Sequence, residues 1–137
     1  MARPTKRRTE NYSFAGIPRI VLDSADYINL SGNAVKLLVE FSRQFKGKNN
    51  GDITAAWSLM RRRGFKSKAT LSRAVSELMA ANIITRTREG AFSRSGPRCA
   101  LYALNWQSID ECGGKLDVPP TKIPIRKFSL EGKPVCK

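Results

Sequence analysis

The sequence predicts an α+β domain in which three main helices are followed by a β-hairpin. Two stretches carry apolar residues at helical spacing, one from Ser31 to Gly47 and one from Ser67 to Asn82. After Asn82 the apolar period changes to two, and a polar stretch rich in Gly and Ser separates the two alternating arms. With 137 residues the chain is long enough for one such domain with tails.

The charge of the chain restricts its partners. The formal net charge is +14 and the pI is near 10.4, an excess that favours nucleic acid or an anionic membrane surface over a neutral partner. No apolar run approaches about 18 residues, and the first residues lack the apolar core of a signal peptide. We therefore expect no membrane partner and a cytoplasmic location.

The residue types argue against an enzyme. The chain has no histidine, and its three cysteines, Cys99, Cys112 and Cys136, are far apart and outside any CxxC spacing. Zinc sites and hydrolytic triads draw on Cys and His at suitable spacings. Only Asp110 and Glu111 are adjacent among the acidic residues. We expect no catalytic residues, no metal and no cofactor, with reduced cysteines, Cys99 in a strand and Cys136 in a tail.

Composition divides the chain into three parts. Residues 1–12 form a basic flexible arm without apolar periodicity, residues 13–111 form the domain, and residues 112–137 form an extended tail rich in Gly and Pro. The arm either lies along a polyanion or only aids solubility. The tail is apolar enough at Ile123, Ile125 and Phe128 to dock on the domain or on a second copy.

The domain begins with short elements and a long central helix. Asp23 or Ser24 could cap a short helical turn, after which Tyr27, Ile28 and Leu30 would cover one side of the core. The helix that begins at Ser31 ends at Gly47, which would adopt the left-handed conformation of a C-cap. Its apolar stripe consists of Ala34, Leu37, Leu38, Phe41 and Phe45, widened by Val35 and Val39.

A turn and a short strand follow this helix. Residues 48–52, KNNGD, form the turn, and Ile53 forms a short strand that pairs with the later hairpin. Thr54 then caps a short helix that ends at Gly64. In that helix we expect Ala56, Leu59 and Met60 to face the core.

The next helix follows after a break of about three residues. Ser67 is placed as its N-cap, and the inward stripe consists of Leu71, Val75, Leu78 and Asn82, flanked by Ala74 and Met79. Lys66, Thr70, Arg73 and Ser76 remain on the outer side. Two short helices separated by such a Gly-containing break form a helix-turn-helix unit.

The hairpin after Asn82 carries a long basic loop. β-Branched residues form its first arm, and Leu101, Tyr102 and Leu104 form the second. We expect Trp106 to close the hairpin and pack on the base of the sheet. The polar tip between the arms contains Gly90, Ser93, Ser95, Gly96 and Pro97.

Positive charge is concentrated over the helix pair and the hairpin. Between Arg61 and Arg98 there are ten basic residues and two acidic residues, Glu77 and Glu89, which gives a local charge of +8. A solvated face normally mixes its signs, whereas a one-sided charge spread over a helix, its preceding turn and a hairpin is typical of a polyanion-binding surface.

These motifs resemble the winged helix-turn-helix domains of bacterial regulators. The tract SKATLSRAVSELMAANIITRT is similar to the recognition-helix pattern of the GntR-like members, S-x-x-T-[VL]-x-x-A-[LV]-x-x-L-x-x-x-[GN]-[IL]-[IL]. Residues 20–106 together resemble the small helix-turn-helix proteins of bacterial prophages, plasmids and integrative elements. The chain lacks the second, effector-binding domain of the GntR-like proteins, so control by a ligand through that route is not implied.

The resemblance implies a nucleic-acid site on the helix and the wing. Residues 67–73 would face the major groove or its flanking phosphates, and the wing around residues 94–98 would contact the minor groove or the backbone. The candidate nucleic-acid-binding residues are Lys66, Ser67, Lys68, Thr70, Ser72, Arg73, Arg61, Arg62, Arg88, Arg94, Ser95 and Arg98.

The leading hypothesis is a double-stranded DNA-binding protein, a transcriptional regulator from a mobile element such as a bacteriophage or plasmid, associated with the nucleoid. Helix 67–82 would dock in the major groove, and a homodimer on a palindrome would strengthen binding. The alternative is a replication or assembly factor that binds origin DNA or RNA, with a protein partner on the Pro-rich tail. A fold turned to protein recognition, such as a phage-encoded inhibitor, fits the +14 charge less well.

Overall fold

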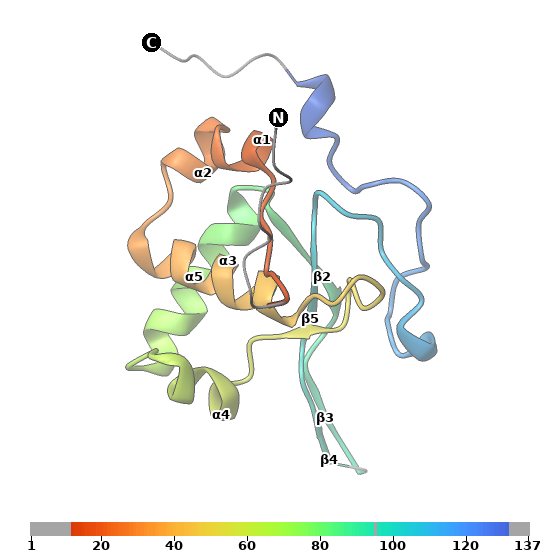
Figure 1. Cartoon of the computed structure of the whole chain (residues 1–137). Helices are drawn as coiled ribbons and strands as arrows, with labels where there is room; N and C mark the ends of the chain where they lie inside the picture. The colour runs from red at the N-terminus through yellow and green to blue at the C-terminus, as the bar shows by residue number, and fades with distance from the viewer. Residues whose placement is uncertain (1–11, 95, 132–137) are drawn as a thin grey trace, which may run out of the picture.

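The computed structural model describes residues 12–94 and 96–131, so the basic arm up to residue 11, Ser95 and Cys136 lie outside the described residues. The described chain is an α+β domain in which helices cover one side of a small antiparallel sheet (Figure 1). The α-helices are α1 (Arg19–Leu22), α2 (Ala25–Ile28), α3 (Gly32–Gln44), α4 (Trp57–Met60) and α5 (Lys68–Ala80). The strands are β1 (Ile53–Thr54), β2 (Ile84–Arg88), β3 (Ala91–Ser93), β4 (Gly96–Arg98) and β5 (Leu101–Leu104). Three short 3₁₀ turns are η1 (Arg61–Arg63), η2 (Cys112–Gly114) and η3 (Phe128–Leu130).

The core lies between the two long helices and the sheet. Leu37 and Phe41 of α3 and Leu78 of α5 are fully buried, and the ring of Phe41 stacks on that of Tyr102 in β5 with centroids 5.5 Å apart. Trp106 is partly buried against the same core, as predicted. The apolar stripes read from the sequence therefore form one contiguous core.

Serine side chains begin three of the helices. The hydroxyl oxygens of Ser24, Ser31 and Ser67 accept hydrogen bonds from backbone N–H groups three residues later, which confirms the predicted N-caps. The long helix α3 ends earlier than predicted. Phe45 already has an extended backbone, and Gly47, with φ of 102°, lies beyond the helix rather than at its C-cap.

Two apolar residues assigned to the core are exposed instead. Val39, expected to widen the stripe of α3, is 47% exposed, and Ile28 of α2 is 65% exposed. Tyr27 and Leu30 pack against the core as predicted. Both side chains lie on the sides of α2 and α3 that face away from the core. Helical spacing alone therefore overestimated the width of the buried face.

The helix before the break is shorter than predicted. Thr54 was expected to cap it, but Thr54 belongs to β1 and the N-cap position is Ala56, whose N–H donates to the Thr54 hydroxyl at 3.1 Å. The helix α4 has a single turn with Met60 buried, continues as η1, and ends at Gly64 with φ of 100°. Gly64 therefore ends the helix as predicted, because glycine tolerates the left-handed conformation.

The helix α5 ends at Ala80, and the prediction that Asn82 joins its buried stripe is wrong. Asn82 is exposed with φ of 58°, a left-handed conformation that asparagine tolerates better than most residues. The Asn105 amide donates to the carbonyl and side-chain oxygens of Asn82, each at 3.0 Å. Asn82 thus turns the chain from α5 into β2.

The main sheet has the strand order β1-β5-β2, and all its pairs are antiparallel. Ile53 pairs with Tyr102 of β5, which confirms the predicted short strand. The long loop predicted at the tip of the hairpin is instead a two-stranded ribbon of β3 and β4, in which Phe92 faces Pro97. Cys99 follows β4 and is exposed, so its assignment to a strand is wrong.

Asn50 fixes the turn before β1 to the sheet. Its buried side chain donates to the carbonyls of Leu104 at 3.0 Å and Ser108 at 2.9 Å, and it accepts from the Leu104 N–H at 2.7 Å. Beside it, the Thr87 hydroxyl donates to the carbonyl of Gly51 at 2.6 Å. Buried polar groups of this kind need such partners, and here they set the position of β1 on β5.

Residues 112–131, the C-terminal segment, lie along the domain. The N–H groups of Asp117, Thr121 and Arg126 donate to carbonyls of the domain at 2.9 Å each. Phe128 is buried, whereas Ile123 and Ile125, the other two residues expected to dock, are 56% and 37% exposed. The segment is largely irregular, as its composition indicated, and η2 and η3 are its regular turns.

Arg126 attaches the C-terminal segment to α2 and α5. Its guanidinium, which is 10% exposed, pairs with Asp26 and Glu131 at 2.7 Å and donates to the carbonyls of Ala81 and Asn82 at 3.1 Å. It also lies over the Phe128 ring, 4.1 Å from the centroid. Because Glu131 and Asp26 stabilise its charged form, the pKa of Arg126 is raised.

Candidate nucleic-acid interface

Five exposed basic residues lie around the break between α4 and α5, and we call them the basic face. They are Arg61 and Arg62 on η1, Lys66 before α5, and Lys68 and Arg73 on the first two turns of α5. Gly64 reverses the chain between the two groups, and Phe65, which is buried, fixes the break to the core. The structure therefore brings these five candidate residues into one region of the surface.

Local hydrogen bonds arrange the first turn of α5. The Thr70 N–H donates to the Ser67 hydroxyl oxygen at 3.1 Å, and the Ser67 hydroxyl donates to that of Thr70 at 2.9 Å. Arg73 makes a long contact, 3.4 Å, to the Thr70 hydroxyl. Ser67 and Thr70, both candidate site residues, thus hold the helix start, while Ser72, another candidate, is exposed beside them.

The acidic residues near the basic face point away from it. Both carboxylate oxygens of Glu77 accept from Ser31 at the start of α3, from its N–H at 2.6 Å and its hydroxyl at 2.7 Å. Glu40 on α3 pairs with Arg63 at 2.7 Å and raises the pKa of that guanidinium, chiefly through the hydrogen bond. Within residues 12–94 and 96–131, no acidic side chain forms an ion pair with the five residues of the basic face.

The hairpin arginines differ among themselves. Arg98 pairs with Asp117 of the C-terminal segment, and Arg88 donates to the carbonyl of Cys99 at 2.9 and 3.1 Å. Arg86 donates to the Tyr102 hydroxyl at 3.2 Å and pairs with Glu89 at 3.3 Å. Arg94, at the turn of the ribbon, is exposed and pairs with no acidic residue in the described part of the chain.

Asp117 holds both strands at the base of the ribbon. Its carboxylate accepts from the N–H of Glu89 at 3.1 Å, before β3, and from Arg98 at the end of β4. These two donors, the Glu89 N–H first, lower the pKa of Asp117 below its ordinary range. The ribbon therefore leaves the domain from a fixed base.

The basic face and the ribbon lie toward the same end of the molecule. In Figure 1, α4, the N-terminal end of α5 and the β3–β4 ribbon all lie in the lower part of the view, with α1 and α2 near the top. The sheet and the helices each project one basic element toward that end. A long polyanion could contact both elements at once.

The sequence did not reveal the acidic residues whose contacts determine which arginines and lysines stay without an ion pair. Glu40, Glu77 and Asp117 are separated from their partners by 23, 46 and 19 residues, and no motif in the sequence announces such distant contacts. It also missed Phe92, which is 90% exposed on the ribbon. An aromatic residue inside a polar loop was the signal that could have drawn attention to it.

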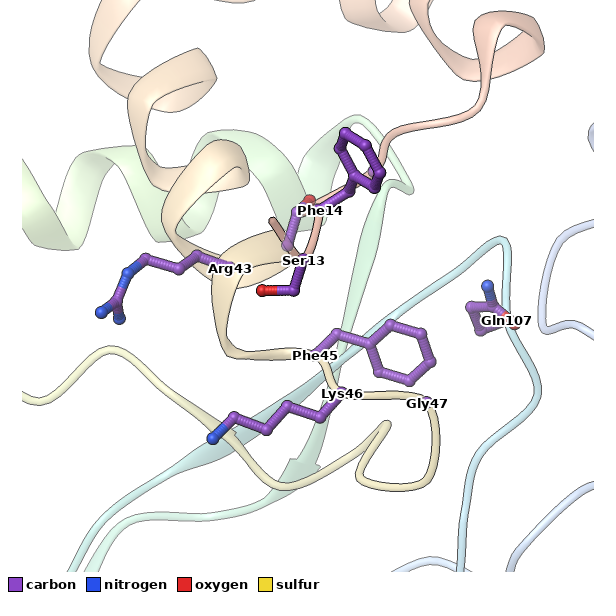
Figure 2. A pocket seen from close by; sticks show the side chains of 9 residues that line it. Ser13, Phe14, Arg43, Phe45, Lys46, Gly47 and Gln107 are labelled. Atoms are coloured by element: carbon purple, nitrogen blue, oxygen red, sulfur yellow. The ribbon is translucent and has the colours of Figure 1, made fainter. Parts of the chain in front are cut away.

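A separate hollow lies between the N-terminal stretch and the end of α3 (Figure 2). It has a volume of about 550 Å³ and is lined by Ser13, Phe14, Gly16, Ser42, Arg43, Phe45, Lys46, Gly47 and Gln107. The rings of Phe14 and Phe45 point to one side of Ser13, and the charged ends of Arg43 and Lys46 point to the other. The hollow is open, and Phe14 is 92% exposed.

The described residues form no metal site, no disulfide and no membrane-spanning helix. Within residues 12–94 and 96–131, no three His, Cys, Asp or Glu side chains are grouped so as to hold a metal ion. The described cysteines, Cys99 and Cys112, are unpaired, and burial raises the pKa of the Cys112 thiol. No helix in this part of the chain has the length and apolar character needed to cross a bilayer.

Comparisons of the chain with protein-family models, with curated proteins and with solved structures found no match.

Proposed function

We propose that this protein binds double-stranded DNA through a winged helix-turn-helix, with α5 in the major groove. The order of elements supports this fold: α3, β1, α4, α5, β2 and β5 follow one another, and β1 and β2 flank β5. In such a fold the helix pair is α4 and α5, and the hairpin of β2 and β5 with its ribbon is the wing. A short turn ending at Gly64 separates the helix pair.

The observation that carries the proposal is the charge of the basic face, which pairs with no acidic residue in the part of the chain that the structure describes. Five cations lie exposed around one helix start, while Glu77 and Glu40 bind Ser31 and Arg63 instead. A cluster of one sign without counter-charges repels itself in the free protein. Phosphates would relieve that repulsion, and their condensed counterions would be released on binding.

The positions on α5 suggest distinct roles. Lys68 and Arg73 are long enough to reach guanine edges in the major groove, where lysine and arginine pair with the O6 and N7 acceptors. Arg61, Arg62 and Lys66 flank the helix and would contact phosphates. Ser72 and the hydroxyl of Thr70 lie beside them and could take a phosphate or a base edge.

The biological setting that fits is transcriptional regulation in a bacterial mobile element. A single small domain makes few base contacts, and a homodimer on two half-sites would raise both affinity and specificity. The described chain has exposed apolar residues in the C-terminal segment, Ile123 and Leu130 among them, that could contribute to such a dimer. Replication or assembly on origin DNA or RNA is the competing role.

Selection from a random duplex pool tests the proposal. We expect wild-type protein at near-physiological salt to retain a motif, and the double variant Lys68→Ala/Arg73→Ala to lose it. The control Lys122→Ala/Lys127→Ala removes the same charge from the C-terminal segment and should retain it. Preference for a single-stranded RNA pool would contradict duplex binding. Retention of duplexes without a motif would contradict the regulatory role and favour the replication or assembly role.

A further inference from the structure

Phe92 occupies an unusual place on the ribbon. Its side chain is 90% exposed on β3, and its cross-strand neighbour Pro97 is also exposed. Directly opposed residues of an antiparallel pair place their side chains on the same face. Phe92 and Pro97 therefore form one apolar surface on a ribbon whose other described side chains are small or basic.

The ribbon carries this apolar surface away from the core. Figure 1 shows β3 and β4 projecting beyond the three-stranded sheet. The residues from Arg88, the last of β2, to Ser93, the last of β3, would span roughly 17 Å in extended conformation. Such a projection can enter a groove next to the one that a helix of the same domain occupies.

The base of the ribbon is held in position. Asp117 accepts hydrogen bonds from both sides of it, from Glu89 and from Arg98. At the same base, Arg88, the last residue of β2, donates to the carbonyl of Cys99, which follows β4. Because these contacts fix the direction of the ribbon, Phe92 does not need to be ordered from a flexible loop on binding, which lowers the entropic cost of insertion.

The surroundings of Phe92 favour DNA over a protein partner. Arg94 lies two residues along the chain, exposed and without an acidic partner among the described residues. The minor groove has a negative potential that attracts arginine, and apolar wedges such as Phe and Pro insert between base steps there and kink the duplex. An apolar surface beside an unpaired cation on a narrow ribbon matches that site.

We infer that Phe92, supported by Pro97, is a wedge that inserts into a base step from the minor groove and bends the DNA. This inference rests on the proposed DNA binding and adds a source of specificity to it. Pyrimidine–purine steps unstack most readily, so the wedge would select such a step. The bend would bring flanking phosphates toward the basic face.

The test uses a duplex of about 30 base pairs built on the selected site, or on random sequence around a central TA step if no motif emerges. Dyes at its ends report bending by energy transfer, and 2-aminopurine placed at successive positions reports unstacking. The proteins compared are wild type, Phe92→Ala, Phe92→Leu and Phe14→Ala. Phe14 is equally exposed but distant in sequence from the ribbon, which makes it the matched control.

We expect wild type, Phe92→Leu and Phe14→Ala to shorten the end-to-end distance and to raise 2-aminopurine fluorescence at one step. Phe92→Ala should bind about tenfold more weakly and leave the duplex straight and stacked. Binding by wild type to a straight duplex, or equal bending by Phe92→Ala, would overturn the wedge alone. No binding by wild type at any of these duplexes would overturn the proposed function and the wedge together.

Discussion

Arg126 and Arg73 carry the same guanidinium in opposite surroundings. Arg126 is 10% exposed and lies between two carboxylates and two carbonyls. Arg73 is exposed, and among the described residues its side chain makes a single long contact, 3.4 Å, to a hydroxyl of its own helix. In the described residues, carboxylates such as Glu40, Glu77 and Asp117 join elements that are distant in the sequence. In the described part of the chain, the basic residues at the start of α5 pair with no acidic side chain.

The largest expected effect separates the buried side of α5 from its exposed side. Replacing the fully buried Leu78 with Ala should lower the free energy of unfolding by about 2 to 5 kcal/mol, because a cavity opens between α3 and α5. The exposed Ser76 on the same helix is the control, and Ser76→Ala should change stability by no more than about 0.5 kcal/mol. Equal denaturant midpoints for the two variants would contradict the assignment of the faces of α5.

The next effect concerns the paired arginine. Replacing Arg126 with Ala should lower the free energy of unfolding by roughly 2 to 4 kcal/mol, because Asp26, Glu131 and the two carbonyls lose their donors. The neighbouring exposed Lys127→Ala should leave stability almost unchanged. Urea unfolding measures the stability of both variants. If the Arg126→Ala variant were as stable as wild type, the contacts of Arg126 would not hold the C-terminal segment.

The unpaired arginine should behave in the opposite way. Arg73→Ala should weaken binding to the preferred duplex by about 1 to 3 kcal/mol if Arg73 reads a base, with unfolding unchanged. Binding isotherms on the preferred site and on a scrambled duplex distinguish the two possible contacts. A backbone contact would weaken both duplexes alike, and an unchanged affinity for both would remove Arg73 from the interface.

The smallest expected effect is a fall in the free energy of unfolding at acid pH. Hydrogen bonds from the Glu89 N–H and Arg98 lower the pKa of Asp117, and those from Arg126 lower the pKa of Glu131. A carboxyl whose pKa is lower in the folded state contributes stability above its unfolded pKa, and that contribution is lost as the pH falls through the folded value. Stability should therefore decline below about pH 4.

Unfolding of the variant Asp117→Asn/Glu131→Gln between pH 7 and pH 3 checks this expectation. The variant should be less stable than wild type at pH 7, and the difference should shrink as the pH falls through the lowered pKa values of the folded state and the wild-type carboxyls become protonated. A difference that stays constant with pH would mean that the two carboxylates do not stabilise the fold through their charge.

Local features of the fold could be predicted from the sequence, and distant contacts could not. The N-caps at Ser31 and Ser67 and the stop at Gly64 depend on a few neighbouring residues, and the structure has them as predicted. Asn82 and Thr54 were misplaced because their roles are set by Asn105 and by strand pairing. Helical spacing cannot reveal partners that lie elsewhere in the chain.

The same distinction applies to the candidate site. Clustering of basic residues marked the region from Arg61 to Arg98 without the structure. Which of those residues are free depends on Glu40 and Asp117, which bind Arg63 and Arg98 across the fold. The extension of the hairpin into a ribbon, and with it the position of Phe92, depended on pairing between Ala91–Ser93 and Gly96–Arg98 in a stretch that composition assigned to a loop.

The most direct test of the account is the salt dependence of duplex binding. Each phosphate contact adds about 0.9 to the slope of log affinity against log salt, so Arg61→Ala/Arg62→Ala should be shallower than wild type by roughly 2. The control Lys122→Ala/Lys127→Ala carries the same net charge and should keep the wild-type slope. Equal slopes for both variants, whether reduced or not, would contradict the claim that the basic face binds DNA.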